Sequence, residues 1–207
     1  MASVVSVNVG RALQLAGRTS AFRKEPIAGP VRIGHLGLEG DEHADGKNHG
    51  GPERAVLMYA EAHYPLWRDE LGVAELPYGG FAENLTVRGL TEADVCIGDS
   101  LRAGGAVLQI ACPRAPCWKI GARWEVDDLT QQVTRTARIG WLLRVLEEGT
   151  VEAGAAVELV ERPHPELTVD HAYSVFSRRR GGSAAARELA ACPLLTPSWR
   201  EALARRR

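Results

Sequence analysis

The sequence predicts a mainly β protein, a barrel or a sandwich, followed by a small module of three helices. Many short apolar runs, separated by turns rich in glycine and proline, predict the strands. The charge changes sign along the chain: residues 1–161 hold 16 Arg or Lys against 22 Asp or Glu, whereas residues 162–207 hold nine against four. We therefore predict one domain over residues 1–163 and a second over residues 164–207.

The composition and the cysteine pattern indicate a cytoplasmic protein. The 207 residues are 45% hydrophobic and 25% charged, a balance typical of soluble globular proteins. No apolar run approaches the ~20 residues of a membrane span, and residues 1–7 lack the features of a signal peptide. The four cysteines, at positions 96, 112, 117 and 192, form no Cys-x-x-Cys pair. We therefore expect a reducing compartment and no disulfide bond.

Seven short segments of the first domain predict strands. The first alternates polar and apolar side chains, and the others are brief runs bounded by turns. Gly104-Gly105 supplies a tight turn between the fifth and sixth segments, which predicts a hairpin. The segments are residues 3–9, 31–33, 55–59, 83–87, 97–102, 106–111 and 157–160.

Two further segments of this domain predict helices. Residues 60–71 follow a buried strand, and Pro65 marks either a break or the first turn of a helix that begins later. Residues 127–148 carry an apolar residue at every fourth position, which predicts one buried helix face, although Gly140 allows two shorter helices. The residues expected to face inward are Ala62, Tyr64, Leu66 and Trp67 in the first segment and Leu129, Val133, Ala137, Trp141 and Val145 in the second.

Three short helices are predicted in the second domain. They follow Thr168, Ser183 and Thr196, whose hydroxyls suit helix N-caps, and Pro197 favours a first helical position. Their expected core is Val169, Ala172, Phe176, Leu189, Trp199 and Leu203. Basic runs at 178–180 and 205–207 are compatible with DNA binding, but the positive patch is small, so a solvated face is favoured over nucleic-acid binding.

Residues 110–120, named the Cys117 segment below, carry the first candidate site. Pro113 and Pro116 restrict the backbone, which predicts a stiff, non-helical segment after a strand. Arg114 and Lys119 flank Cys117, and positive neighbours favour the thiolate, which is both a nucleophile and a ligand for soft metals. The alternative is that Cys117 packs in the core, as free cysteines usually do.

Other candidate residues lie in the predicted loop 34–51 and after it. Asp41, His43 and His49 match no established zinc spacing, and they instead hold the loop or bind ligand oxygens. His49 precedes two glycines, which suits a turn that approaches a ligand closely, or it is a loop histidine bonded to backbone. Glu83-Asn84 orients a polar heterocycle or begins a strand. Arg54, together with Arg114 and Lys119, is a candidate phosphate ligand, because arginine forks match phosphate oxygens.

In order and spacing, these clusters resemble the MOSC family, named for the C-terminal domain of molybdenum cofactor sulfurase. The segment Pro113-Arg-Ala-Pro-Cys117 with Lys119 is similar to the cysteine motif of the family. Gly140-Trp141 and the helical tail resemble its bacterial YiiM-type subgroup. The other matching pieces are Gly37-Leu-Glu-Gly-Asp41, His49-Gly-Gly51, Tyr59 with His63-Tyr64, Glu83-Asn-Leu85 and Ile97-Gly-Asp99.

The resemblance implies a MOSC-type β-barrel, like the barrel domain of pyruvate kinase, with peripheral helices and a C-terminal three-helix module. It implies binding of the molybdenum cofactor (molybdopterin), a pterin dithiolene with a phosphate, and Cys117 as the protein ligand to the metal. Family members are also associated with pyridoxal phosphate binding. YiiM-type proteins are associated with detoxification by reduction of N-hydroxylated bases and related compounds.

We therefore expect a reductase of N-hydroxylated compounds, with Cys117 at a molybdenum centre and a separate reductase as electron donor. Arg54, Arg114 and Lys119 would hold the phosphate and pterin, while His49, Glu83 and Asn84 would line the cavity. The alternative is a sulfur carrier or cofactor-binding module, in which Cys117 holds a persulfide and no turnover occurs. The sequence leaves the oligomeric state open, and a homodimer is one possibility.

Overall fold

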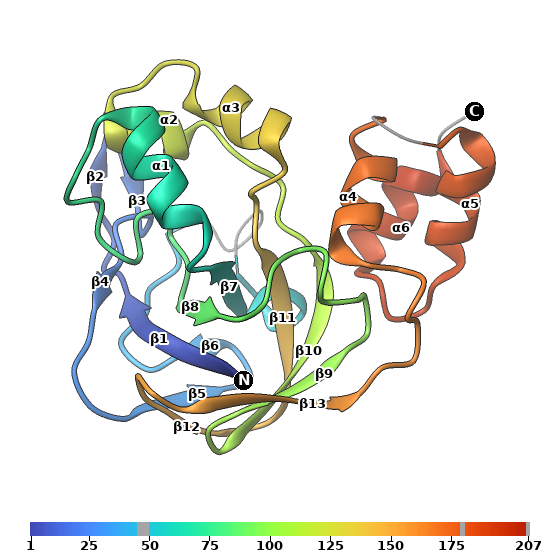
Figure 1. The fold of residues 1–207 in the computed structure, drawn as a ribbon, viewed down its shortest axis with the longest axis horizontal. Helices are drawn as coiled ribbons and strands as arrows, with labels where there is room; N and C mark the ends of the chain where they lie inside the picture. The colour runs from blue at the N-terminus through green and yellow to red at the C-terminus, as the bar shows by residue number, and fades with distance from the viewer. Residues whose placement is uncertain (45–49, 179–180, 206–207) are drawn as a thin grey trace.

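The computed structural model describes residues 1–44, 50–178 and 181–205 of the chain. Seven strands close into a barrel in the order β13, β9, β10, β11, β7, β8, β1, and β1 pairs back to β13. Figure 1 shows α1, α2 and α3 at one end of these strands and α4, α5 and α6 beside them. The barrel strands are β1 (Ala2–Val9), β7 (Val56–Ala60), β8 (Leu85–Arg88), β9 (Ser100–Ala103), β10 (Ala106–Pro113), β11 (Trp141–Glu147) and β13 (Ala156–Glu161). The mainly β prediction and its barrel alternative are confirmed.

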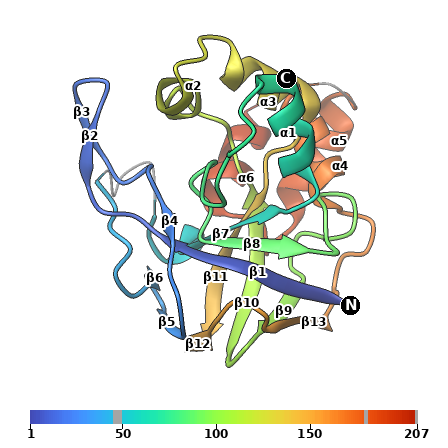
Figure 2. The ribbon, with the colours of Figure 1, turned by 60° about the vertical axis from the view of Figure 1, so that its left-hand side comes forward.

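Six shorter strands lie outside the closed barrel in the described part of the chain. Strands β2 (Leu13–Leu15) and β3 (Arg18–Ser20) form a hairpin that projects from it (Figure 2), and β4 (Glu25–Pro26) pairs with the end of β1. Strands β5 (Val31–Gly34), β6 (Gly37–Leu38) and β12 (Gly149–Val151) make a separate small sheet. All seven predicted strand segments coincide with strands of the structure or overlap them.

Helix α1 (His63–Leu71) packs an aromatic cluster onto the barrel. Trp67 donates its indole N–H to the Tyr59 hydroxyl at 2.7 Å, and that hydroxyl donates to the Arg138 carbonyl at 3.0 Å. Tyr59 and Phe81 stack with ring centroids 5.0 Å apart. These large rings are therefore buried with their polar ends paired, as buried Tyr and Trp require.

The predicted inward face of α1 is partly wrong. Tyr64 and Trp67 are buried, but Leu66 is 44% exposed and Ala62 is exposed, while His63 is buried. Pro65 lies in the first turn, where its missing N–H costs no intrahelical hydrogen bond. The helix therefore begins later than predicted, which is one of the two roles expected for Pro65.

The prediction of a helix over residues 127–148 is wrong in its second half. Helix α3 covers Leu129–Thr136 and ends at Ala137 with φ 58°, and Gly140 then adopts φ 75° before β11 begins. Trp141, Leu143 and Val145 alternate with more exposed residues, so β11 buries one face. A spacing of four residues fits a helix face, but it is also a multiple of the strand period of two, so the apolar pattern did not distinguish them.

Helices α4 (Val169–Phe176), α5 (Ser183–Ala191) and α6 (Pro197–Ala204) confirm the three predicted helices. The Thr168 hydroxyl accepts from the His171 N–H at 3.1 Å, and Pro197 occupies the first turn of α6. Gly182, and not the predicted Ser183, is the N-cap of α5, and the Thr196 side chain makes no capping bond. The Phe176 and Trp199 rings stack with centroids 3.8 Å apart, inside the predicted core.

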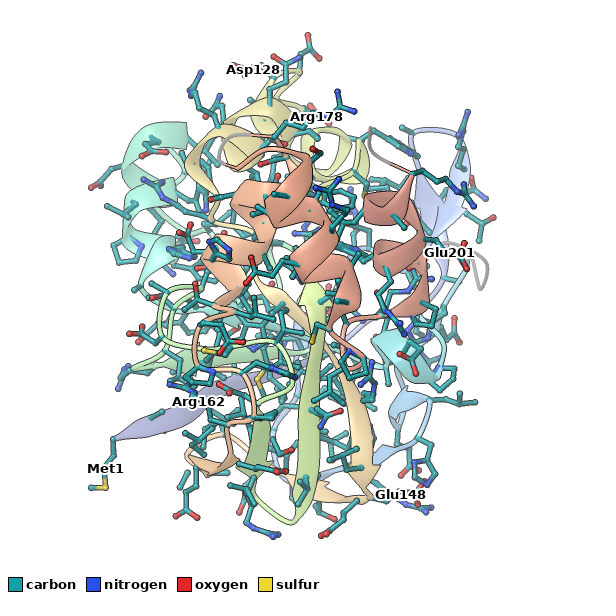
Figure 3. The ribbon with its side chains drawn as sticks, turned by 90° about the vertical axis from the view of Figure 1, so that its right-hand side faces the viewer. Met1, Asp128, Glu148, Arg162, Arg178 and Glu201 are labelled. Carbon is teal, nitrogen blue, oxygen red and sulfur yellow. The ribbon has the colours of Figure 1, made fainter. Side chains whose placement is uncertain are left out.

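Backbone hydrogen bonds join α4 and the start of α6 to the first domain. The Thr196 N–H donates to the Ala111 carbonyl of β10 at 3.0 Å, and the Asp170 N–H donates to the Glu92 carbonyl at 2.9 Å. Figure 3 views the molecule from the side of these helices, with barrel strands extending below them. The N-terminal end of α6 is thereby fixed beside the strand that leads into the Cys117 segment. Within the described residues, no helix has the length and apolar character needed to cross a membrane.

We predict that Gly140→Ala lowers the free energy of unfolding by about 3 kcal/mol or more. A Cβ at this position would lie 2.4 Å from the Met58 carbonyl oxygen, in a backbone conformation at φ 75° that L-residues rarely adopt. Gly17→Ala is the matched control, because Gly17 has φ 76° and, among the described residues, no neighbour within 4 Å of the place a Cβ would take. It should lose about 1–2 kcal/mol from backbone strain alone. Urea unfolding of both variants measures the difference, and equal losses would contradict the steric explanation.

Candidate functional site

A cavity opens where the Cys117 segment meets the barrel. Five of the seven predicted site residues line its wall: Arg54, Asn84, Arg114, Cys117 and Lys119. They come from the short 3₁₀ helix Pro52–Arg54, the turn before β8 and the Cys117 segment. The remaining wall is Ser20, Ala21, Phe22, Lys24, Glu42, His43, Ala44, Gly50, Leu57, Ala82, Ala115, Leu142 and Trp199.

Cys117 lies between a strand that the sequence predicted and a helix that it did not. Strand β10 ends at Pro113, and helix α2 (Lys119–Trp124) begins two residues after the cysteine. The Cys117 carbonyl accepts from the Ile120 N–H at 3.1 Å and from the Thr130 hydroxyl at 3.1 Å. These bonds fix the backbone, while Cys117 is half-buried and lines the cavity.

Arg114 is a buried cation with an unused donor. The backbone N–H of Arg114 donates to the Gly140 carbonyl at 3.1 Å, which joins the Cys117 segment to the turn before β11. The guanidinium lies 5.8 Å from the centre of the Phe22 ring, and the residue is 6% exposed. Among the described residues, Nη1 has no hydrogen-bond partner although it is buried. An unpaired guanidinium donor in a cavity wall suits an anionic oxygen of a ligand.

Asn84 lines the cavity but uses its amide to hold the site together. Its Oδ1 accepts from the Leu57 N–H at 3.0 Å, and its Nδ2 donates to Asp41 at 2.9 Å. Asp41 also accepts from the Gly10 N–H at 2.8 Å and forms an ion pair with Lys24. The expectation that Asp41 holds the loop agrees with these contacts. Asn84 joins that loop to β7.

Glu83 does not line the cavity, so the interpretation of this residue as a cofactor contact needs correction. It is fully buried, and its carboxylate accepts from the Gly79 N–H at 2.8 Å, the Thr86 hydroxyl at 2.8 Å and the Tyr64 hydroxyl. Burial, followed by the Glu83 charge, raises the pKa of Tyr64 well above its ordinary value, which keeps the phenol a donor. Glu83 therefore organises the turn that precedes β8.

Of the predicted loop residues, His49 lies outside the described part of the chain, and His43 lines the cavity. Burial lowers the pKa of His43, which favours its neutral form. A Cβ on Gly50 would lie 2.4 Å from the His43 ring, so glycine permits this approach. Within the described residues, no group of three His, Cys, Asp or Glu side chains could hold a metal ion.

Lys24 and Trp199 are two of the cavity residues that the sequence did not predict as site residues. Lys24 reaches the wall from the segment after the β2–β3 hairpin, and Trp199 reaches it from α6. Neither belongs to a local pattern that predicts a site. The Trp199 ring was assigned to the helical core, and its stacking on Phe176 shows that it serves the core and the cavity wall together.

Comparison with known proteins identifies the family. The model of the MOSC domain matches residues 45–158, which is more than half of the chain. The chain belongs to the MOSC family. It is 38% identical to the uncharacterized protein YflK of Bacillus subtilis over 202 residues, spanning 96% of this chain and 91% of that protein. It is 37% identical to protein YiiM of Escherichia coli over 193 residues, spanning 92% and 86%.

Two further comparisons bear on fold and chemistry. The crystal structure of YiiM from Geobacillus stearothermophilus superposes with a TM-score of 0.84 at 34% identity, covering 98% of this chain and 97% of that one. A reductase of Gibberella moniliformis is 39% identical over 164 residues, which are 78% of this chain and 29% of that protein. The family and the YiiM-type fold expected from the sequence motifs are therefore confirmed.

We predict that a thiol reagent labels Cys117 first in the folded protein. The other three cysteines are buried, and burial raises the pKa of the Cys112 thiol to about 12. Mass spectrometry after brief treatment with iodoacetamide should find the label on Cys117. Denatured protein, in which all four thiols react, is the control. Equal labelling of Cys112 in the folded state would contradict this arrangement.

Proposed function

We propose that this MOSC protein binds the molybdenum cofactor and reduces N-hydroxylated compounds, such as N-hydroxylated purine bases, with electrons from a separate reductase. One observation carries the proposal: half-buried Cys117 and buried Arg114, whose Nη1 has no hydrogen-bond partner among the described residues, line the same cavity. The first suits a soft metal and the second suits a phosphate, and the cofactor carries both groups.

The chemistry of the cavity wall fits this cofactor. Among the described residues of the wall, Cys117 supplies the thiol. Cationic side chains come from Lys24, Arg54, Arg114 and Lys119. Arg114 Nη1 offers an N–H that the described residues leave unpaired, so a phosphate or pterin oxygen would satisfy it at little further desolvation cost. We therefore assign Cys117 as the metal ligand and Arg54, Arg114 and Lys119 as the residues that bind the phosphate and pterin.

When bound, the cofactor supplies the two-electron chemistry that removes oxygen from an N–OH group. The protein supplies position and shielding. Phe22, Leu57 and Leu142 give the wall apolar surface that excludes water, and Trp199 adds a large planar side chain. The stiff Cys117 segment fixes the sulfur relative to Arg114, which lies three residues before it.

The electron donor is proposed to be a separate protein. The related protein of Gibberella moniliformis is named a reductase, and the aligned segment is 29% of its length. The likeness to a much longer reductase supports a redox role for this domain. It also supports cooperation with a domain or partner that delivers electrons, because the cofactor must be reduced after each turnover.

We expect molybdenum near one atom per chain in protein purified from a host that makes the cofactor, and loss of the metal in Cys117→Ala. Metal analysis by mass spectrometry measures both. Cys192→Ala is the matched control, because Cys192 is buried in the helical tail and is absent from the cavity wall. It should keep the metal.

The same preparation tests the rival function. A sulfur carrier would contain no molybdenum and would release sulfur from Cys117 on treatment with cyanide. Reduction of an N-hydroxylated purine with a chemical electron donor is the activity assay. A metal-loaded protein that shows no reduction would contradict the proposed reaction while leaving cofactor binding in place.

A further inference from the structure

Lys24 is a buried lysine that faces the cavity. It lies between the β2–β3 hairpin and β4, its side chain is 8% exposed, and its Nζ forms an ion pair with Asp41. The turn at Gly79 packs against its backbone, because a Cβ on Gly79 would lie 2.7 Å from the Lys24 carbonyl oxygen. A lysine this buried normally has a charged or hydrogen-bonding partner, since removing an ammonium group from water costs free energy.

Asp41 gives Lys24 a fixed counter-charge. The Asp41 side chain has no exposed surface, and it accepts hydrogen bonds from the Gly10 N–H at 2.8 Å and from Asn84 Nδ2 at 2.9 Å. These donors fix the carboxylate, and the carboxylate in turn fixes the ammonium of Lys24, a residue of the cavity wall. The pair is therefore a positioned acid and not a mobile surface ion pair.

The surroundings of Lys24 ease loss of its proton. Burial lowers the pKa of the ammonium, while Asp41 and, more weakly, Glu83 oppose that change. The other charged or titratable groups of the described cavity wall are Glu42, His43, Arg54, Arg114, Cys117 and Lys119. Arginine holds its proton at any ordinary pH, so the two buried cations of the wall, Lys24 and Arg114, suit different tasks.

The proposed reaction consumes protons. Reduction of R–NH–OH to R–NH₂ and water needs two electrons and two protons, and the electrons come from the external reductase. The N–O bond breaks, and O–H and N–H bonds form. A shielded cavity needs at least one internal donor, because water is restricted there when the reacting group is bound.

We propose that Lys24 is the proton donor of this site and that Asp41 is its positioning residue. The inference rests on the proposed function. Lys24 Nζ gives one proton to the oxygen that leaves as water, and the neutral amine regains a proton from solvent between turnovers. The second proton comes from solvent. Arg114 keeps its charge throughout and serves the bound anion.

Two sets of substitutions test the proposal. Lys24→Arg keeps the positive charge next to Asp41 but removes a proton that can be released. We expect kcat to fall about 100-fold or more, while KM and molybdenum content stay near those of the wild type. Because Lys24→Met alone would leave the Asp41 carboxylate buried without a counter-charge, the double variant K24M/D41N is the second test. It should fold and keep its metal but lose kcat to a similar degree.

The pH profile separates a proton donor from a structural cation. In the wild type, kcat should fall as pH rises through the pKa of Lys24, because the donor form is lost. That alkaline limb should disappear in Lys24→Arg. Arg32→Gln is the control for a lost surface cation, since Arg32 pairs with Glu148 and is absent from the cavity wall. It should keep the wild-type profile.

The outcomes distinguish this proposal from the proposed function. Full kcat in Lys24→Arg overturns the proton-donor role while the reductase stands. Loss of molybdenum in both Lys24→Arg and K24M/D41N would overturn the proton-donor role and show that Lys24 is needed for cofactor binding instead. A metal-loaded wild type without reduction overturns both proposals.

A second measurement does not depend on activity. The chain has three lysines, at positions 24, 47 and 119, so selective ¹³C labelling gives few signals to assign by NMR. The signal that Lys24→Arg removes should titrate at lower pH than an ordinary lysine. Titration at the ordinary lysine value would overturn the proposal.

Discussion

The antiparallel ladder between β10 and β11 is the contact on which the cavity depends. It runs from Val107 opposite Glu147 to Pro113 opposite Trp141, and it continues through the hydrogen bond from the Arg114 N–H to the Gly140 carbonyl. The end of this ladder therefore fixes the start of the Cys117 segment. The same strand also accepts the Thr196 N–H at Ala111, so α6 and its Trp199 are placed by β10 as well. One ladder thus positions the thiol, the buried guanidinium and the aromatic part of the wall.

Buried carboxylates organise the segments around that ladder. Glu83 fixes the turn before β8 through the Gly79 N–H, and Asp41 fixes its loop through the Gly10 N–H. Glu92 accepts from the Ile139 and Gly140 N–H groups at 3.0 and 2.7 Å and pairs with His63 at 2.7 Å. Each satisfies backbone N–H groups in an irregular segment that no strand or helix could pair. These irregular segments of backbone are thereby held by buried hydrogen bonds.

Local pattern was sufficient for much of this fold and for part of the site. Short bounded apolar runs predicted the strands, and the prolines beside Cys117 predicted a fixed thiol next to Arg114. Residues 141–147 were missed because a four-residue apolar spacing satisfies a strand as well as a helix. Lys24 and Trp199 could not be predicted, since their positions depend on contacts between residues distant in sequence: Lys24 pairs with Asp41, and α6, which carries Trp199, is bonded to β10. Glu83 was misjudged because adjacent residues need not share an environment: Asn84 lines the cavity, whereas the Glu83 carboxylate is buried in the turn before β8.

The closure of the barrel also constrains how the chain can fold. Ser3 of β1 pairs with Arg88, and Ala2 pairs with Val157, so the partners of this strand lie far along the sequence. Until they arrive, β1 has its pairing to β4 at Asn8 and Val9, and the rest of its backbone remains an open edge. Loop closure over such distances is entropically costly and slow. The barrel can therefore close only after these distant strands meet, and the edge of β1 that they cover is open to pairing with other chains until then.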